Sequence, residues 1–359
     1  METSNSNSES EGGKSETFYY GYDPEMETLT ISGSGEIRKN LLEKYPKSSV
    51  RTLVIQGEVE SIGDDAFRGF SFLTVEISSP IQSIGNNAFC GCDRLRSIKI
   101  PAGVTSLGSY VFYGCSFLEN VELSSSIQSI GDNAFCLCDR LKSIKIPAGV
   151  TSLGSYVFHG CSSLENVELS SSLQSIGDKA FCGCDRLESI KIPASVTSMG
   201  TSVFDGCDHL EKIESESLRY PAEDGVLFKV ADDGKKILVR YPSNRKGKHY
   251  TIPKDVVEIE EYAFAKCPNL KSIMIPKTVR KIGYGAFDTW PSKIRLIVPE
   301  GRKSAYKADP VWKKCKVIEI SDLKLSDRLW ILRNTLLRNV RSKISYSDVV
   351  SRRKKRIAL

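Results

Sequence analysis

The sequence predicts a repeat solenoid, a stack of coils of about 23 residues that is mostly β and irregular and presents one parallel β-sheet face. Six phenylalanines from Phe89 to Phe204 recur at an unbroken spacing of 23 residues. Glycines keep step four positions before them, and apolar columns of Leu, Ile and Val follow the same period. A fixed period of roughly 20 to 50 residues is typical of a solenoid. Because so short a coil cannot enclose a core, each coil must bury its apolar columns against its neighbours.

The chain is expected to open with a disordered lead-in over residues 1–17. This segment is rich in Ser, Asn and Glu and has no apolar run, so it also lacks the features of a signal peptide. The solenoid is expected over residues 18–320. Within one coil, L-R-S-I-K-I-P alternates apolar and polar residues before a proline, which predicts a short half-buried strand that stops there.

An insert interrupts the period at about residues 216–250, because 60 residues separate Phe204 from Phe264. The segment G-V-L-F-K-V-A-D-D-G-K-K-I-L-V-R-Y-P predicts a hairpin of two strands joined at residues 231–234. Such an insert either projects from one face and carries binding or bridges two half-solenoids, and both interpretations remain open.

The last segment, residues 321–359, carries eleven Lys and Arg against three Asp. Apolar residues from Leu329 to Val340 have helical spacing and Ser326 is available as N-cap, so a basic amphipathic helix is predicted. A basic cluster follows the helix: Arg352, Arg353, Lys354, Lys355 and Arg356. Three roles stay open for this tail. It caps the last coil, it remains solvated, or it binds a target, which is a protein partner, an anionic membrane surface or nucleic acid. The cluster also matches a nuclear localisation patch.

These residues resemble the BspA-like, or Treponema-type, leucine-rich repeat, whose unit reads L-x-x-I-x-I-P, then V, I-G, A-F and a closing G-C. The unit L-R-S-I-K-I-P-A-G-V-T-S-L-G-S-Y-V-F-Y-G-C fits it, although Glu260 stands where a glycine is expected. By resemblance, residues 296–320 look like the family's closing coil and cap. The resemblance implies surface adhesion or binding of host proteins, with no shared reaction and no shared ligand site.

The cysteines fall into two columns. One lies three residues after each phenylalanine: Cys92, Cys115, Cys138, Cys161, Cys184 and Cys207. Stacked side chains in this column would point the same way, with Cβ atoms about 4.8 Å apart instead of the roughly 3.8 Å of a disulfide. We therefore expect small buried thiols that fill the inside of a turn instead of a disulfide ladder.

The second column lies one residue after the phenylalanine and contains types that bind metals, such as Cys136, His159 and Cys182. Cys136 and Cys182 would lie two coils, about 9.6 Å, apart, which is too far for one zinc ion, so no metal or other cofactor is expected. A redox sensor at Cys136 or Cys182 is a remaining alternative. The repeat places none of the three histidines beside a nucleophile, so we expect no catalytic residue, no enzyme and no small-molecule substrate.

The predicted strands alternate in charge from coil to coil: Glu76, Lys99, Glu122, Lys145, Glu168, Lys191 and Glu214. In a parallel sheet in register, each Glu would lie between two Lys, which supports register and neutralises the sheet. The alternative is a striped recognition surface that matches a partner of complementary charge. The candidate partner-binding residues are Glu122, Lys145, Glu168 and Lys191 on the strands and Arg240, Arg245, Lys246 and Lys248 in the insert.

Together these features favour a noncatalytic module that binds a protein partner through its solenoid surface. An intracellular structural scaffold recruited by the basic tail is the alternative, followed by a thiol-based redox or metal-binding sensor. The lack of a signal peptide favours the cytoplasm, whereas the family resemblance implies the cell surface, so the location stays open.

Overall fold

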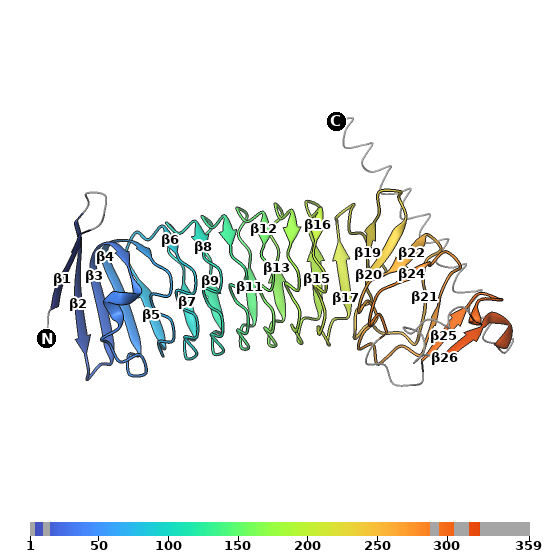
Figure 1. Cartoon of the computed structure of the whole chain (residues 1–359), viewed down its shortest axis with the longest axis horizontal. Helices are drawn as coiled ribbons and strands as arrows, with labels where there is room; N and C mark the ends of the chain where they lie inside the picture. Colours follow the sequence, from blue (N-terminus) through green and yellow to red (C-terminus); the bar gives the residue numbers. More distant parts are fainter. Residues whose placement is uncertain (1–3, 10–14, 288–293, 305–315, 324–359) are drawn as a thin grey trace, which may run out of the picture.

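The computed structural model describes residues 4–9, 15–287, 294–304 and 316–323. Its coils follow one another along the long axis of the molecule, from the first strands at one end to the closing strands at the other (Figure 1). Neighbouring coils are parallel and in register, since Ser143 pairs with Asn166 and Ile144 with Val167, 23 residues on. The prediction of a solenoid with parallel sheets and 23-residue coils is therefore confirmed.

Two rows of short strands run along the first part of the solenoid. The first row is β5 (Thr74–Ile77), β7 (Ser97–Lys99), β9 (Asn120–Glu122), β11 (Ser143–Lys145), β13 (Asn166–Glu168), β15 (Ser189–Ile192) and β17 (Lys212–Ser215). The second row is β6 (Ser83–Ile84), β8 (Ser106–Leu107), β10 (Ser129–Ile130), β12 (Ser152–Leu153), β14 (Ser175–Ile176) and β16 (Ser198–Met199). We call the outer surface of the first row the strand face.

Longer strands form the N-terminal end. They are β1 (Ser4–Glu9), β2 (Ser15–Asp23), β3 (Thr28–Ile37) and β4 (Thr52–Ile62), with a 3-10 helix η1 (Lys39–Leu42) between the last two. β4 pairs in parallel with β3, β5 and β6 and so starts both rows. β1 and β2 are antiparallel. Disorder was predicted for residues 1–17, whereas the structure places Ser4–Glu9 in a strand, because the edge of β2 offers backbone groups that even a polar segment can pair.

The phenylalanine column forms the centre of the core. Phe89, Phe112 and Phe135 are fully buried, and neighbouring rings stack with centroids 5.5 Å apart. Two positions before each ring, the backbone is left-handed even without glycine, with φ of 54° at Asn87 and 59° at Tyr110. This repeated tight turn directs every phenylalanine inward, so that the period of the sequence becomes a column of rings.

The insert consists of β18 (Ala222–Glu223), β19 (Val226–Val230) and β20 (Lys236–Arg240). β19 and β20 are antiparallel, which confirms the predicted hairpin. Its side chains divide between two hydrophobic cores: Leu227 packs in the core of the first half, whereas Phe228 and Leu238 pack in that of the second. Of the two interpretations of the insert, the structure supports the bridge between half-solenoids.

The second half continues the coil pattern with β21 (His249–Thr251), β22 (Val256–Ile259), β23 (Ser272–Met274), β24 (Lys281–Ile282), β25 (Arg295–Val298) and β26 (Lys316–Glu319), followed by the 3-10 helix η3 (Ile320–Asp322). β26 pairs in parallel with β25, within the segment expected to form the cap. The predicted C-terminal helix and the basic cluster lie outside the described residues.

Candidate functional site

The strand face carries opposite charges on neighbouring strands. Lys99 lies opposite Glu122 and Lys145 opposite Glu168 in the parallel register. The ammonium and carboxylate groups of these pairs are 3.4 Å and 3.0 Å apart. The side chains are nevertheless 79% exposed at Lys145 and 70% at Glu168, so a partner can reach them.

Each Glu was expected to lie between two Lys, and among the ion pairs of the described residues Glu122 and Glu168 each have one Lys partner. The coils of the first row form hydrogen-bonded ladders in smaller groups. Hydrogen-bonded ladders join β5, β7 and β9, then β11 with β13, then β15 with β17, in the described part of the chain. Glu122 therefore pairs with Lys99, and Lys145 with Glu168. Strands that read I-K-I-P alternate with strands that read V-E-L-S, so the 46-residue spacing in the sequence corresponds to this grouping.

The last rung of the strand face also differs from the expected pairing. Lys191 and Glu214 are register partners, yet the Lys191 ammonium lies 2.6 Å from the Glu216 carboxylate, and Lys212 pairs with Glu214. The hydrogen bond from Lys191 to Glu216 raises the pKa of Lys191, and that from Lys212 lowers the pKa of Glu214. The alternating series thus ends in local pairs where the insert begins.

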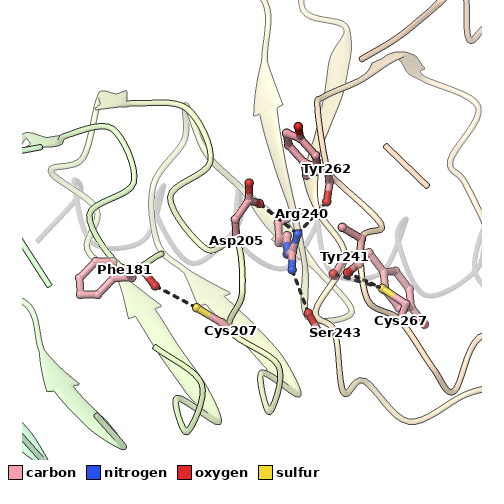
Figure 2. Close-up of polar contacts among 9 residues, drawn as sticks. Phe181, Asp205, Cys207, Arg240, Tyr241, Ser243, Tyr262 and Cys267 are labelled. Carbon is pink, nitrogen blue, oxygen red and sulfur yellow. Dashed lines mark hydrogen bonds and ion pairs between the residues drawn. The ribbon is translucent and has the colours of Figure 1, made fainter. Parts of the chain in front are cut away.

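Arg240 is a structural residue at the junction, which corrects its assignment to a partner-binding surface. Its side chain is only 3% exposed. Figure 2 shows its guanidinium between the two half-solenoids: Nη1 lies 3.2 Å from Oδ1 of Asp205 and donates to the carbonyl of Tyr262 at 2.7 Å, while Nη2 donates to Oγ of Ser243 at 2.8 Å. A buried cation held in this way fixes the junction and offers nothing to a partner.

The other basic residues of the insert differ in accessibility. Arg245 is 14% exposed, and its Nη2 lies 2.6 Å from Oδ2 of Asp224. Lys246 is 87% exposed and 3.7 Å from Glu211, and Lys248 is also exposed. Of the four candidates in the insert, Lys246 and Lys248 are therefore the two that remain accessible to a partner.

The first cysteine column is buried, as predicted, and each thiol has a definite role in the turn. Cys115 donates to the carbonyl of Phe89 at 3.1 Å, and Cys138 donates to that of Phe112 at 3.2 Å. The same contact recurs at Cys161, Cys184 and Cys207. The sulfur thus fills the turn and also satisfies a buried carbonyl of the preceding coil, a contact that spacing alone does not reveal.

The second column does not favour thiolate chemistry. Burial raises the pKa of Cys136 to about 11 and also raises the pKa of Cys182. The rings of His159 and Tyr156 meet edge to face, with centroids 5.6 Å apart. Because a reactive cysteine needs a lowered pKa, this environment gives the redox alternative no support. In the described part of the chain, no three His, Cys, Asp or Glu side chains gather as metal ligands.

A shallow hollow of about 360 Å³ lies over the second row. The residues that line it include Gly154, Gly177, Gly200, Ser175 and Asp178. The Asp178 carboxylate accepts a hydrogen bond of 2.7 Å from the backbone N–H of Thr201, so it already stabilises the next coil.

The basic cluster Arg352, Arg353, Lys354, Lys355 and Arg356 lies outside the described residues, so its proposed contacts remain predictions. Over the ranges that the structure does describe, we find no helix with the length and apolar character needed to cross a bilayer.

Three accessible basic residues of the second half were not singled out from the sequence: Lys271, Arg295 and Lys316. Arg295 and Lys316 begin β25 and β26 and are register partners, and Lys271 precedes β23 as Lys248 precedes β21. Aligning the units of the second half by their strands would have placed Arg295 and Lys316 in one column and Lys271 one position before it. The insert and the irregular lengths of these coils hide that alignment.

The chain matches the family described as BspA type leucine rich repeat region in six copies, over residues 36–165, 128–223 and 241–338. A leucine rich cell surface protein from Faecalibacterium prausnitzii is 31% identical, with a TM-score of 0.65, over 82% of this chain and 76% of that one. Leucine-rich repeat proteins from Eubacterium ventriosum and Bacteroides ovatus are 22% and 23% identical, each with a TM-score of 0.45, over 84% of this chain and 66% and 98% of theirs. No curated protein matches the chain. With its stacked coils and a family match over more than half its length, the chain belongs to the BspA-type leucine-rich repeat family.

Proposed function

We propose that the chain is a noncatalytic module that binds a protein partner through the strand face. One observation carries the proposal: charged side chains such as Lys145 and Glu168 stay largely exposed although a stacked scaffold fixes their positions. A rigid array of this kind presents a charge pattern without the entropic cost of ordering it on binding. The leucine rich cell surface protein from Faecalibacterium prausnitzii supports a role at a surface that meets other proteins.

The test is affinity capture of partners from the native source, with full-length protein and the variant Lys145→Glu as baits. This change places three acidic residues on neighbouring strands and should abolish capture of a specific partner, while thermal unfolding shifts only slightly because exposed pairs are worth about 0.2 to 1 kcal/mol. In the control, Lys145→Glu combined with Glu168→Lys, the ion pair is restored in reversed order. It should recover thermal stability without recovering capture.

Recruitment by the basic tail is the second proposal, and the same assay separates it. A chain without residues 321–359 should still capture the partner if the strand face binds it. Capture that survives Lys145→Glu but is lost with the tail would reject the strand face and favour a scaffold recruited by residues 352–356.

A further inference from the structure

The second half-solenoid places one basic side chain at the start, or one residue before the start, of each of four neighbouring strands of one sheet: Lys248, Lys271, Arg295 and Lys316, which we call the basic ladder. All four residues are exposed. The Lys271 N–H donates to the carbonyl of Lys248 at 2.6 Å, and the Arg295 N–H donates to that of Lys271 at 3.0 Å. Arg295 and Lys316 are direct register partners. Ser272 is the register partner of Arg295, so Lys248 and Lys271 lie one position before the level of Arg295 and Lys316. The four residues thus lie on successive strands, within one residue of the same edge of the sheet.

The basic ladder reverses the charge rule of the first half. There, register partners have opposite signs, as in Lys99 with Glu122. Here, Arg295 faces Lys316, and like charges directly opposite each other destabilise a sheet. Among the ion pairs of the described residues, none includes a member of the basic ladder. A row of uncompensated charge costs folding stability, so it is better explained by a ligand that neutralises it.

Nearby acidic residues are already engaged elsewhere. At the junction, Asp205 pairs with Arg240, Asp208 with Lys266 and Asp224 with Arg245. Residues 229–304 carry 17 Lys and Arg against eight Asp and Glu. The second half therefore carries a surplus of nine positive charges, 17 minus 8, to which an external anionic group is attracted.

The composition of the basic ladder favours carboxylates over nucleic acid. Three of its four members are lysines, which act as point charges, whereas phosphate recognition favours the bidentate guanidinium of arginine. Single-stranded nucleic acid also needs exposed aromatic rings on which its bases stack. The rings next to the start of β21 do not provide them, because Tyr250 and Tyr241 are only 3% and 1% exposed.

We propose that the basic ladder binds an extended acidic segment of the protein partner, an inference that rests on the proposed function. At about 4.8 Å between strands, the four rungs span roughly 14 Å. An extended polypeptide covers that distance with about four or five residues. A short run of Asp and Glu lying across the strands places carboxylates over all four cations.

The test measures fluorescence anisotropy of a labelled ten-residue poly-glutamate peptide with the full chain. All proteins carry glutamine at residues 352–356, so that the tail does not compete. The variant Lys248→Glu, Lys271→Glu, Arg295→Glu should bind the peptide roughly tenfold more weakly, since three exposed attractions become repulsions. The matched control is Arg94→Glu, Arg96→Glu, Lys142→Glu, which changes net charge equally at exposed residues of the first half that have no assigned role in binding, and it should change affinity less than about twofold.

A glutamine version of the three substitutions in the basic ladder guards against misfolding, because it removes the charges without adding acids, and it should also weaken binding. Equal losses in the control and in the basic-ladder variant would overturn the proposal. Tighter binding of a ten-nucleotide thymidine strand than of the peptide would assign the basic ladder to nucleic acid. A dimer that sedimentation shows only for the unsubstituted chain would assign it to a second copy.

The two hypotheses fail separately. If substitutions in the basic ladder leave the affinity for poly-glutamate unchanged, but Lys145→Glu still abolishes capture of native partners, this inference is rejected and the proposed function stands. If capture fails in every form while poly-glutamate still binds, the proposed function falls.

Discussion

Glycines along the second row of strands are required by close stacking between coils. Gly131 has no left-handed φ, yet a Cβ there would lie 2.5 Å from the backbone N of Ser109 in the preceding coil. Glu260 breaks the column where β20 of the insert replaces a regular coil beneath it, as the hydrogen bond from its N–H to the Leu238 carbonyl indicates. One coil later the requirement returns, since a Cβ on Gly283 would lie 2.3 Å from the N of Glu261.

Gly131→Ala should therefore destabilise the protein by about 1 to 3 kcal/mol, because the backbone beneath must shift to admit a methyl group. Gly21→Ala is the matched control, since a Cβ on Gly21 meets nothing within 4 Å. Urea unfolding gives the free energy of both variants. Similar losses at the two positions would show that coil spacing is not the reason for the glycine column.

The buried thiols predict slow chemical modification and sensitivity to alkaline pH. Because burial raises the pKa of Cys136 to about 11, its thiol stays protonated at pH 8. Pulse alkylation with iodoacetamide and peptide mapping should label Cys136 and Cys138 slowly in the folded chain and fully in urea. Rapid labelling of folded Cys136 would revive the redox alternative.

The raised pKa of Cys136 also determines how the stability of the folded chain changes with pH. A thiol whose pKa is higher in the folded state binds more protons there than in the unfolded chain. Stability is therefore retained at neutral pH and falls as the pH rises above the ordinary thiol value, from about pH 8.5 upward. Urea midpoints measured between pH 7 and pH 10 test this, and a rising midpoint would contradict it.

Much of the residue-level pattern could be predicted, and the exceptions have physical causes. Phe89 and Cys115 lie in columns whose period reveals their burial. Arg240 could not be placed in the same way, because a buried arginine and a surface arginine look alike in a sequence. Its partner Asp205 lies 35 residues away, and the contact depends on how the insert packs.

At the scale of elements, the insert couples the two half-solenoids. Its hairpin was predictable because turn residues separate two apolar runs, and β19 and β20 form as expected. Its bridging role was not predictable, since that depends on Leu227 entering one core and Phe228 the other. The grouping of coils on the strand face was likewise hidden, although the 46-residue spacing marked its period.

Arg240→Ala should destabilise the junction by about 3 to 5 kcal/mol, because it removes a buried cation that pairs with Asp205 and leaves carbonyl and hydroxyl groups without their donor. Lys235→Ala, which breaks an exposed pair with Asp233 in the same hairpin, should cost less than about 1 kcal/mol. Hydrogen exchange of β21 and β23 reports the loss. Exchange that is unchanged in Arg240→Ala would mean that the second half is held without this contact.

At the scale of the whole molecule, the solenoid has two hydrophobic cores in series, and the two halves that contain them differ in net charge. Residues 18–228 carry 27 Asp and Glu against 17 Lys and Arg, whereas the segment after them is basic. The halves meet through pairs such as Asp208 with Lys266. Continuous stacking explains why single coils need no core of their own and why the exterior is free to vary. The solenoid was predictable from its period. The difference in net charge between the two halves was not, because it emerges only when charges are summed over each half, and the coils of the second half have irregular lengths.

The most direct test of binding through the strand face is hydrogen exchange of the full chain with and without its captured partner. The account predicts slower exchange in peptides that contain β7, β11 and β15, with the second row over the glycine column unchanged. Protection confined to residues 321–359, with the strands exchanging as in the free chain, would contradict it.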